Sequence, residues 1–325
     1  MRTVVSIGVA LGVLVSGTAY ARAADANAAP ETSETCRLPG ASNVLAFECA
    51  GFDVSVGTVF MKRHSTGGVI IVPPTGTPGT ILTGDDLDFD REFGPDIYAR
   101  WRINQGWSVE GRYFGSSSEA THNIPSITTF RIAGIGVTIL GSGPIDSTFS
   151  SRLQSAEVNV AKEVIPGVSL LAGFRHVGLD ENLRIDIATA ATYTNWNVQN
   201  DLYGGQLGLK LGFMAPSLPL EFSAAFKGGV YHNAASNDFT STIVGSTSST
   251  ATTTAYSGEI DLGATYHFNN HLSIRGGYSS LWLRNVALGD TQAEATVQGG
   301  GGTSSPVAFG NVRYDAFSLR ASYAF

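Results

Sequence analysis

The chain is short of charge and of long apolar runs. Charged residues make up 14% of its 325 residues, whereas about a quarter is usual in soluble domains. After the first residues, no apolar stretch approaches the roughly 18 residues that a membrane-spanning helix requires, which excludes a helical membrane protein. The mean hydropathy is only +0.08. Glycine is abundant, with 39 residues. This composition fits a membrane β-barrel, in which half of each strand faces lipid and half faces a polar interior.

Cysteine is also scarce. The two cysteines, Cys36 and Cys49, both precede the first expected strand. Export would place them in an oxidising compartment, and they are candidates for a disulfide that would contribute roughly 3 kcal/mol by loop closure. A metal or redox pair is the alternative, which the lack of a nearby histidine disfavours.

The first residues have the features of a secretory signal peptide. A short positive start is followed by an apolar core at Val4–Val15, which is too short to span a bilayer as a helix. Small residues around Ala19–Ala23 favour cleavage after Ala23 over an uncleaved anchor. Residues 1–23 are therefore the predicted signal peptide, 24–50 a periplasmic segment, and 51–325 the barrel. Removing Arg2 and Arg22 changes the net charge from −7 to about −9, which gives no sign of nucleic-acid binding.

Period-two alternation of apolar side chains recurs in segments of about ten residues and predicts strands. We expect ten, around Val54–Phe60, Ile97–Ile103, Val109–Tyr113, Ala156–Val160, Val168–Phe174, Leu207–Phe213, Leu220–Phe226, Ile260–Phe268, Leu272–Trp282 and Phe317–Phe325. The last strand ends on an aromatic residue that completes its apolar face. Leu319, Ala321, Tyr323 and Phe325 therefore resemble the signal that the barrel-assembly machinery recognises in outer-membrane proteins.

The connections alternate in length. Turns near residues 105, 165, 216 and 269 are short, whereas the stretches at about 64–91, 115–152, 178–200, 232–255 and 284–312 are long and polar. Tight periplasmic turns and long extracellular loops are the outer-membrane arrangement, and they disfavour a soluble β-sandwich. We expect Thr240–Thr254 to be a mobile surface loop and Gly299–Gly302 a flexible tip. Thr128–Leu140 and Leu183–Tyr193 could instead extend strands or add a hairpin, which would make twelve strands.

Aromatic residues gather at the expected strand ends, as they do at membrane interfaces. One group lies beside the periplasmic turns and a second near the opposite ends. The first is Trp101, Trp107, Phe213, Tyr266, Phe268, Tyr323 and Phe325, and the second is Tyr113, Tyr256 and Trp282.

The strand faces assigned inward carry charges of both signs in nearly equal number. They are Asp53, Asp96, Arg100, Arg102, Glu110, Arg112, Glu157, Arg175, Lys210, Glu221, Lys227, Glu259, Asp261, Arg275 and Arg320. A ten-stranded barrel is only slightly wider than the eight-stranded kind, which side chains fill. Isolated charges there are costly, so we expect them to pair and to occupy most of the lumen. The alternative is a water-filled pore of mixed charge.

Five short stretches carry a resemblance to a known family. Phe60–Arg63, Ser155–Val160, Leu171–His176, Tyr203–Gly208 and Gly276–Tyr278 occur in this order. From about residue 52 to its end, the chain resembles the "beta-barrel protein seven" family of outer-membrane proteins, found in planctomycetes and proteobacteria. The resemblance implies an outer-membrane barrel, and it supplies no substrate and no catalytic residues. The Tyr203-Gly204-Gly205-Gln206 segment indicates close strand packing rather than a nucleotide loop, because no helix is expected after it.

Histidines and carboxylates near the expected extracellular ends were considered as an active site. His64, His176 and His232 are the histidines, with Asp180 and Glu181 just after His176. A histidine beside a carboxylate could activate water or a serine, but nothing in the sequence fixes their geometry. The acidic run Asp85, Asp86, Asp88 and Asp90 lacks EF-hand spacing; it could hold divalent cations that bridge lipopolysaccharide.

The sequence thus predicts an all-β, antiparallel, up-and-down barrel in the outer membrane, without an enzymatic function, a metal or a cofactor. We expect a structural or surface-interaction role with a side-chain-filled lumen. A passive channel for small solutes is the first alternative and a surface hydrolase the second. The expected partners are outer-membrane lipid or lipopolysaccharide and, during insertion, the barrel-assembly machinery. The oligomeric state is left open.

Overall fold

The computed structural model describes residues 51–64, 67–73, 79–87, 89–104, 106–132, 135, 138–188, 192–299 and 302–325. The predicted signal peptide, the segment 24–50 and the disulfide candidates Cys36 and Cys49 lie outside this part of the chain and stay predictions. Among the described residues, no helix is both long enough and apolar enough to cross a membrane.

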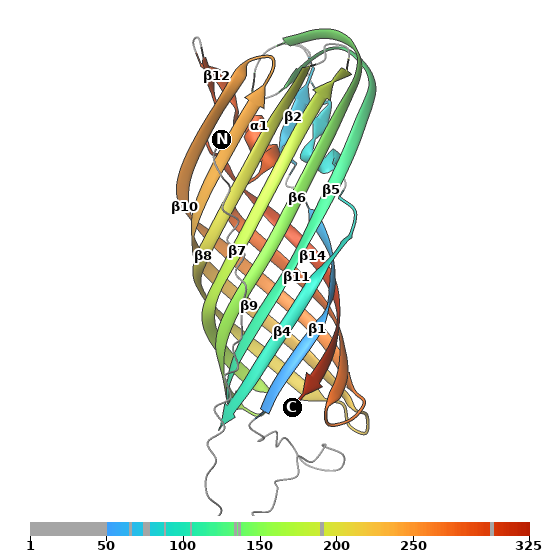
Figure 1. Ribbon diagram of the computed structural model, residues 1–325, viewed down its shortest axis with the longest axis vertical. Helices are drawn as coiled ribbons and strands as arrows, with labels where there is room; N and C mark the ends of the chain where they lie inside the picture. The colour runs from blue at the N-terminus through green and yellow to red at the C-terminus, as the bar shows by residue number, and fades with distance from the viewer. Residues whose placement is uncertain are drawn as a thin grey trace, which may run out of the picture. The chain divides into compact units, whose positions relative to one another are not determined.

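Ten antiparallel strands close into a ring (Figure 1). They are β1 (Gly51–His64), β4 (Glu92–Asn104), β5 (Trp107–Ile132), β6 (Thr138–Ile165), β7 (Val168–Ile187), β8 (Thr192–Met214), β9 (Leu220–Ser241), β10 (Gly245–His267), β11 (Leu272–Ala287) and β14 (Phe309–Ala324). Each pairs with its neighbour along the ring, and β14 returns to β1. The predicted ten-stranded, up-and-down barrel is confirmed.

Six shorter elements lie between these strands. They are β2 (Val69–Val72), β3 (Leu82–Thr83), the 3-10 helix η1 (Gly84–Asp86), the helix α1 (Gly289–Ala295), β12 (Val297–Gly299) and β13 (Gly302–Ser304). β2 pairs with β3 and with the far end of β5, while β12 and β13 form a separate hairpin. The first and last of the predicted long connections therefore contain structure of their own.

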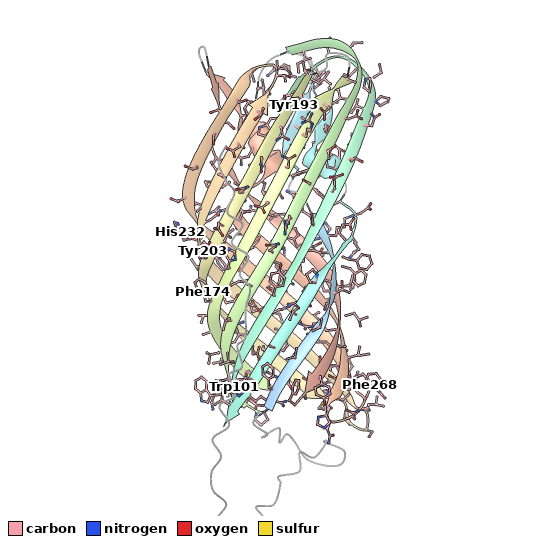
Figure 2. The ribbon with its side chains drawn as sticks, in the orientation of Figure 1. Trp101, Phe174, Tyr193, Tyr203, His232 and Phe268 are labelled. Carbon is pink, nitrogen blue, oxygen red and sulfur yellow. The ribbon has the colours of Figure 1, made fainter. Side chains whose placement is uncertain are left out.

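The lower part of the barrel has apolar side chains outside and polar side chains inside. Leu207 is 69% exposed on the outer face of β8, whereas its neighbour Gln206 is 3% exposed inside. Figure 2 shows Trp101 and Phe268 at the periplasmic end of this surface, with Phe174 and Tyr203 nearer its other end. We call this part the membrane zone; on β7 it runs from Val168 to His176, which suits the 9 to 11 residues of a membrane-spanning strand.

Beyond the membrane zone, six strands continue as a curved sheet. Pairing of β4 with β5 ends at Asp96 and Phe114, whereas β5 and β6 pair on to Arg131. On the other side, β10 leaves β11 at Tyr256, but pairs with β9 up to Gly245. We call the upper parts of β5 to β10, together with β2, β3, η1 and α1, the outer lobe.

In the outer lobe the two faces are exchanged. Trp196, Phe149 and Phe239 point inward and are at most 1% exposed, and they pack with Ile71 of β2 and Ala293 of α1. The outward positions are polar, among them Asn182 and Arg184 of β7. The arrangement is that of a water-soluble domain, in which burial of apolar area is the main stabilising contribution.

Several expected loops are strands instead. The stretches 115–152, 178–200 and 232–255 lie almost wholly in β5 to β10, and Thr240–Thr254 forms the ends of β9 and β10 rather than a mobile loop. Serine and threonine occupy both faces of these extended strands: Thr250 and Thr252 are exposed outside, whereas Ser147 and Ser241 are buried inside. β-Branched threonine favours the extended conformation. Strand extension was expected only as an alternative for Thr128–Leu140 and Leu183–Tyr193. In the structure the strands extend over most of all three stretches. Gly299 and Gly302 end β12 and begin β13, and the tip between them lies outside the described residues.

Candidate functional site

Charged side chains from all around the ring meet inside the membrane zone. At the periplasmic mouth, Asp53 of β1 accepts hydrogen bonds from Arg100 Nε and Arg102 Nη2, both at 2.8 Å. Lys210 of β8 reaches Glu110 of β5 across the lumen at 2.6 Å. The mouth is the most open level, since the Arg100 side chain is 36% exposed and that of Lys210 29%.

One level up, arginines and aspartates alternate. Arg112 Nε donates to Asp96 Oδ1 at 3.0 Å, and its Nη1 lies 3.4 Å from Asp261 Oδ2. Arg275 donates to the other oxygen of Asp261 at 2.5 Å, and Arg320 lies 3.5 Å from Asp96. Each aspartate thus lies between two guanidinium groups, which compensates the cost of removing them from water.

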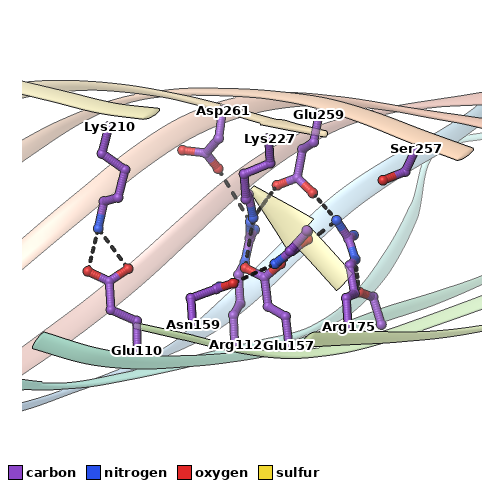
Figure 3. A network of polar contacts seen from close by, with 12 residues as sticks. Glu110, Arg112, Glu157, Asn159, Arg175, Lys210, Lys227, Ser257, Glu259 and Asp261 are labelled. Atoms are coloured by element: carbon purple, nitrogen blue, oxygen red, sulfur yellow. Dashed lines mark hydrogen bonds and ion pairs between the residues drawn. The ribbon is translucent and has the colours of Figure 1, made fainter. Parts of the chain in front are cut away.

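The third level is the most buried (Figure 3). Lys227 Nζ lies 2.7 Å from Glu157 and 2.9 Å from Glu259. Arg175 Nη1 donates to Glu259 at 2.5 Å, while Gln206 donates to Glu157 at 2.8 Å. The side chains of Arg175 and Glu259 are 0% and 2% exposed, so both are shielded from bulk water.

All fourteen charges expected in the lumen from residue 96 onward have a partner. Thirteen lie within 4.0 Å of an opposite charge, and Glu221 lies 3.3 Å from His267. Together with Asp53 and His267 we call them the ionic lattice. Breaking a buried pair of this kind by removing one partner costs about 3–5 kcal/mol.

A glycine makes room for one member of the ionic lattice. A Cβ placed on Gly263 of β10 would lie 2.0 Å from Arg275 Nη1, so the guanidinium group lies flat against the bare backbone. Gly204 shows the same kind of close approach between strands, since a Cβ there would lie 2.0 Å from the Val230 carbonyl oxygen. The Tyr203–Gln206 segment is therefore a packing segment, as expected from the sequence.

Above the ionic lattice an apolar layer fills the cross-section. Phe114, Leu179, Leu202, Tyr231 and Leu283 are among its members, and each is at most 4% exposed. Arg112 and Arg175 stack their guanidinium groups on one face of this layer, 4.8 and 5.6 Å from the Phe114 ring centre. A hydrated ion crossing the barrel would have to displace these packed side chains.

A second, smaller ionic cluster ties α1 to the wall of the outer lobe. Arg63 of β1 donates to both oxygens of Glu181 of β7, at 2.7 and 3.2 Å, and lies 3.9 Å from Asp290 of α1. The Gly289 amide donates to Glu181 at 2.9 Å. Arg63 also stacks over Phe149 at 4.7 Å. No local sequence pattern indicates this cluster, because its members come from three distant segments.

Inward polar groups of β8 bind the end of β11 and the segment that follows it. Asn200 of β8 accepts from the Ala287 amide and donates to its carbonyl oxygen, both at 2.7 Å. Trp196 Nε1 donates to Thr296 Oγ1 at 2.8 Å. These contacts were not predicted from the sequence. The signal available is the position of Trp196, Asn200 and Asn233 on inward strand faces, in stretches expected to be loops.

Of the histidines considered as catalytic residues, His176 and His232 lie in one row of the outer wall with Tyr203 of β8 between them, whereas His64 lies on β1. His176 Nε2 lies 2.6 Å from Asp201 Oδ1, and His64 Nε2 lies 2.9 Å from Asp315. Asp180 faces outward from β7, whereas Glu181 faces inward, so the structure does not bring Glu181 to His176. His232 is exposed on β9, and Figure 2 shows it near Tyr203.

The acidic run of the first long connection lies partly in η1. Asp86 accepts hydrogen bonds from the Thr83 amide at 2.7 Å and from its hydroxyl at 2.8 Å, which holds the pKa of the Asp86 carboxyl below its usual value. Asp88 lies outside the described residues. Within the described part of the chain, no group of three or more His, Cys, Asp or Glu side chains could hold a metal ion.

The C-terminal strand presents the expected apolar face. Phe317, Leu319 and Tyr323 are about half exposed to the outside, and the Phe325 amide donates to the Phe52 carbonyl oxygen at 2.9 Å. Ala321 lies on the same face. Recognition of this face by the assembly machinery stays a prediction.

A closed antiparallel ring with an apolar outer band and a charged interior defines an outer-membrane β-barrel. The chain belongs to the family described as "Putative beta barrel porin-7 (BBP7)", whose sequence model matches residues 104–323. None of the curated proteins matches the chain.

Solved structures similar to this chain are outer-membrane proteins. The outer membrane protease OmpT from Escherichia coli is 9% identical, with a TM-score of 0.52, 87% of this chain covered and 99% of that one. Neisserial surface protein A (NspA) is 13% identical, with a TM-score of 0.32 and coverages of 84% and 97%. At 9% identity the likeness to OmpT shows the fold alone.

Proposed function

We propose that this protein is a structural, surface-interacting barrel of the outer membrane whose lumen does not conduct ions. The observation that carries the proposal is that three successive layers of side chains occupy the lumen from the periplasmic end to the outer end. The ionic lattice is followed by an apolar layer and then by the core of the outer lobe. Above the periplasmic mouth, the side chains of the ionic lattice are at most 15% exposed, and the named residues of the apolar layer are at most 4% exposed.

A passive channel is the second candidate, favoured by the word porin in the family description and by the exposed charges at the periplasmic mouth. Against it stand the nearly balanced charges of the ionic lattice. The lining of a selective pore more often has an excess of charge of one sign. Here every carboxylate of the ionic lattice except Glu221, whose neighbour is His267, lies within 4.0 Å of a Lys or Arg.

Single-channel recording in planar bilayers separates the two candidates. The folded full-length protein is expected to give no stable current steps, under conditions in which a general porin conducts. A Glu259→Ala variant, which loosens the ionic lattice but leaves the apolar layer intact, is expected to stay silent as well. Regular, voltage-stable steps from the unaltered protein would overturn the proposal.

We also propose that the protein is not an enzyme, although OmpT is a protease. His176 and Asp201 form a close pair, but the second oxygen of Asp201 accepts a hydrogen bond from Tyr203 at 2.6 Å. We assign the pair an interfacial role. Hydrolysis of a peptide library or of short-chain esters that is lost in a His176→Gln variant would contradict this assignment.

A further inference from the structure

The outer wall of the outer lobe contains a hollow. It has a volume of about 670 Å³ and spans β7 to β10, with Gly178, Asp180, Asp201, Ala234 and Thr252 among its lining residues. We call it the outer-wall hollow. Its lining consists of short side chains and hydrogen-bonding groups, and none of the residues that line it is Lys or Arg.

The strand register explains why the wall is recessed at this place. Gly178, Asp201, Ala234 and Thr252 lie side by side in one row across four strands. Three of these four side chains are absent or short. A Cβ added to Gly178 would meet nothing within 4 Å, which shows that the space in front of it is open.

The outer-wall hollow lies at the level of lipid headgroups. The row directly below it contains His176, Tyr203 and His232, and Phe174 of the membrane zone follows one row further down. Figure 2 shows Phe174, Tyr203 and His232 close together on the same side of the barrel. Rows on one face of a strand are about 7 Å apart, and Tyr and Trp mark the membrane interface, so the hollow opens just outside the hydrocarbon.

Asp201 is oriented by its neighbours while it stays accessible. Its Oδ1 lies 2.6 Å from His176 Nε2 and its Oδ2 accepts from the Tyr203 hydroxyl at 2.6 Å, yet its side chain is 50% exposed. The His176 and Tyr203 rings are stacked at 4.7 Å. A fixed carboxylate beside an aromatic pair, with Asp180 and the Ser236 hydroxyl nearby, offers acceptors and donors suited to a ligand rich in hydroxyl groups.

We propose that the outer-wall hollow binds the sugar headgroup of an outer-leaflet glycolipid. Because the hollow lies at the level of the lipid headgroups, a sugar carried by a lipid is favoured over a free sugar. Because none of the residues that line the hollow is Lys or Arg, the recognised groups are hydroxyl groups rather than phosphate. This inference deepens the proposed surface-interacting role. Its failure is distinguishable from failure of the closed-lumen proposal, because headgroup binding and ion conductance are measured independently.

The test measures lipopolysaccharide binding to the full-length protein in phosphatidylcholine nanodiscs. Binding by the unaltered protein is expected to fall about tenfold in Gly178→Gln, which fills the hollow, and in Asp201→Asn, which removes its fixed carboxylate. Glu119→Gln, which neutralises an exposed carboxylate on the outer face of β5, is expected to bind as the unaltered protein does. Heat-modifiable migration verifies that each variant is folded.

Three outcomes would overturn the proposal. The first is no binding of lipopolysaccharide above the phosphatidylcholine background. The second is unchanged binding in both hollow variants. The third is equally tight binding of the delipidated, water-soluble oligosaccharide, which would show that a free sugar rather than a membrane glycolipid is the ligand.

Discussion

The membrane zone and the outer lobe are built from the same strands, but the polarity of the inward and outward faces is exchanged between them. On β7, Leu170 and Phe174 point outward and are more than half exposed, while Arg175 points inward and is fully buried. A few residues further along the same strand, Leu183 and Ile185 point inward and are fully buried, while Asn182 and Arg184 point outward. The backbone pairing continues through this change without a shift in register.

The difference follows from the solvent outside each region. In hydrocarbon, an outward apolar side chain is favourable and the interior can hold paired charges. In water, the apolar side chains must turn to the inside, and the lobe then needs extra segments to complete its core. β2, β3 and α1 supply those segments. We therefore predict that substitution of an inward side chain changes the stability for different reasons in the two regions: by burying a charge in the outer lobe, and by removing one in the membrane zone.

The largest effect is expected from a charge placed inside the outer lobe. Leu183→Asp puts a carboxylate into a fully apolar cluster and is expected to destabilise the protein by about 5 kcal/mol or more. Asn182→Asp, the adjacent outward position, is the matched control and is expected to be nearly neutral. Urea unfolding of the refolded protein in detergent measures both. Equal effects would show that the lobe has no apolar interior.

In the membrane zone, the sensitive interior groups are the charges themselves. Glu259→Ala leaves Lys227 and Arg175 without their shared carboxylate and is expected to cost about 3–5 kcal/mol. The exposed Glu119→Gln variant is the control. A loss below about 1 kcal/mol, which is the scale of a solvated ion pair, would mean that water reaches this level.

A bulky residue in the barrel wall behind the ionic lattice is expected to lower the stability by a smaller amount. Gly263→Val places a side chain where the Arg275 guanidinium group lies and is expected to cost about 1–3 kcal/mol by overpacking. Gly276→Val, where an added Cβ meets nothing within 4 Å, is the matched control. The shift in the temperature of heat-modifiable migration compares them. Equal shifts for the two variants would show that the Arg275 guanidinium group does not lie against Gly263.

A hydrogen bond from Trp196 Nε1 to Thr296 Oγ1 joins the segment after β11 to β8. Thr296→Val removes the acceptor of the Trp196 indole N–H and is expected to cost about 1–2 kcal/mol, because a buried donor is left unpaired. Red-shifted, more accessible Trp196 fluorescence is the expected readout, measured in a variant whose other tryptophans are phenylalanine. An unchanged spectrum and stability would argue against this contact.

The smallest expected effect is the pH dependence of local stability at the N-terminus of η1. The pKa of Asp86 is lowered by hydrogen bonds from Thr83, so its contribution is present above the ordinary aspartate pKa of about 3.9 and is lost as the pH falls through the lower, folded value. The protection factors of the η1 amides, which compare their exchange rates with the intrinsic rates at the same pH, should therefore fall in acid. Asp86→Asn should abolish that fall; an acid response that persists would assign it to another group.

The membrane zone was predictable from sequence, and the outer lobe was not. Alternate residues such as Phe317 to Phe325 face lipid on one side only, so a period of two marks each strand and its faces. Balanced charges at inward positions likewise indicated pairing in the lumen. In the lobe, outward Ser and Thr and inward Ala, Asn and Trp give weaker contrast, and the stretch around Thr250 was therefore taken for a loop.

Contacts between distant segments could not be predicted at all. Arg63, Glu181 and Asp290 meet only because β1, β7 and α1 converge inside the lobe, and no local pattern records that meeting. The same holds for Asp201, which sequence analysis did not connect with His176 although the two strands carrying them are adjacent. Register, which pairs Gly178 with Asp201, is the missing information.

Site-directed labelling tests the exchange of faces most directly. With Cys36 and Cys49 replaced by serine, single cysteines are introduced by Phe174→Cys, Leu179→Cys and Asn182→Cys, and intact cells are treated with a charged, membrane-impermeant maleimide. We predict rapid labelling at position 182 only, with position 174 reached by a lipid-soluble reagent and position 179 by neither. Labelling of position 179 as fast as position 182 would contradict the account, because it would require an open, water-filled interior.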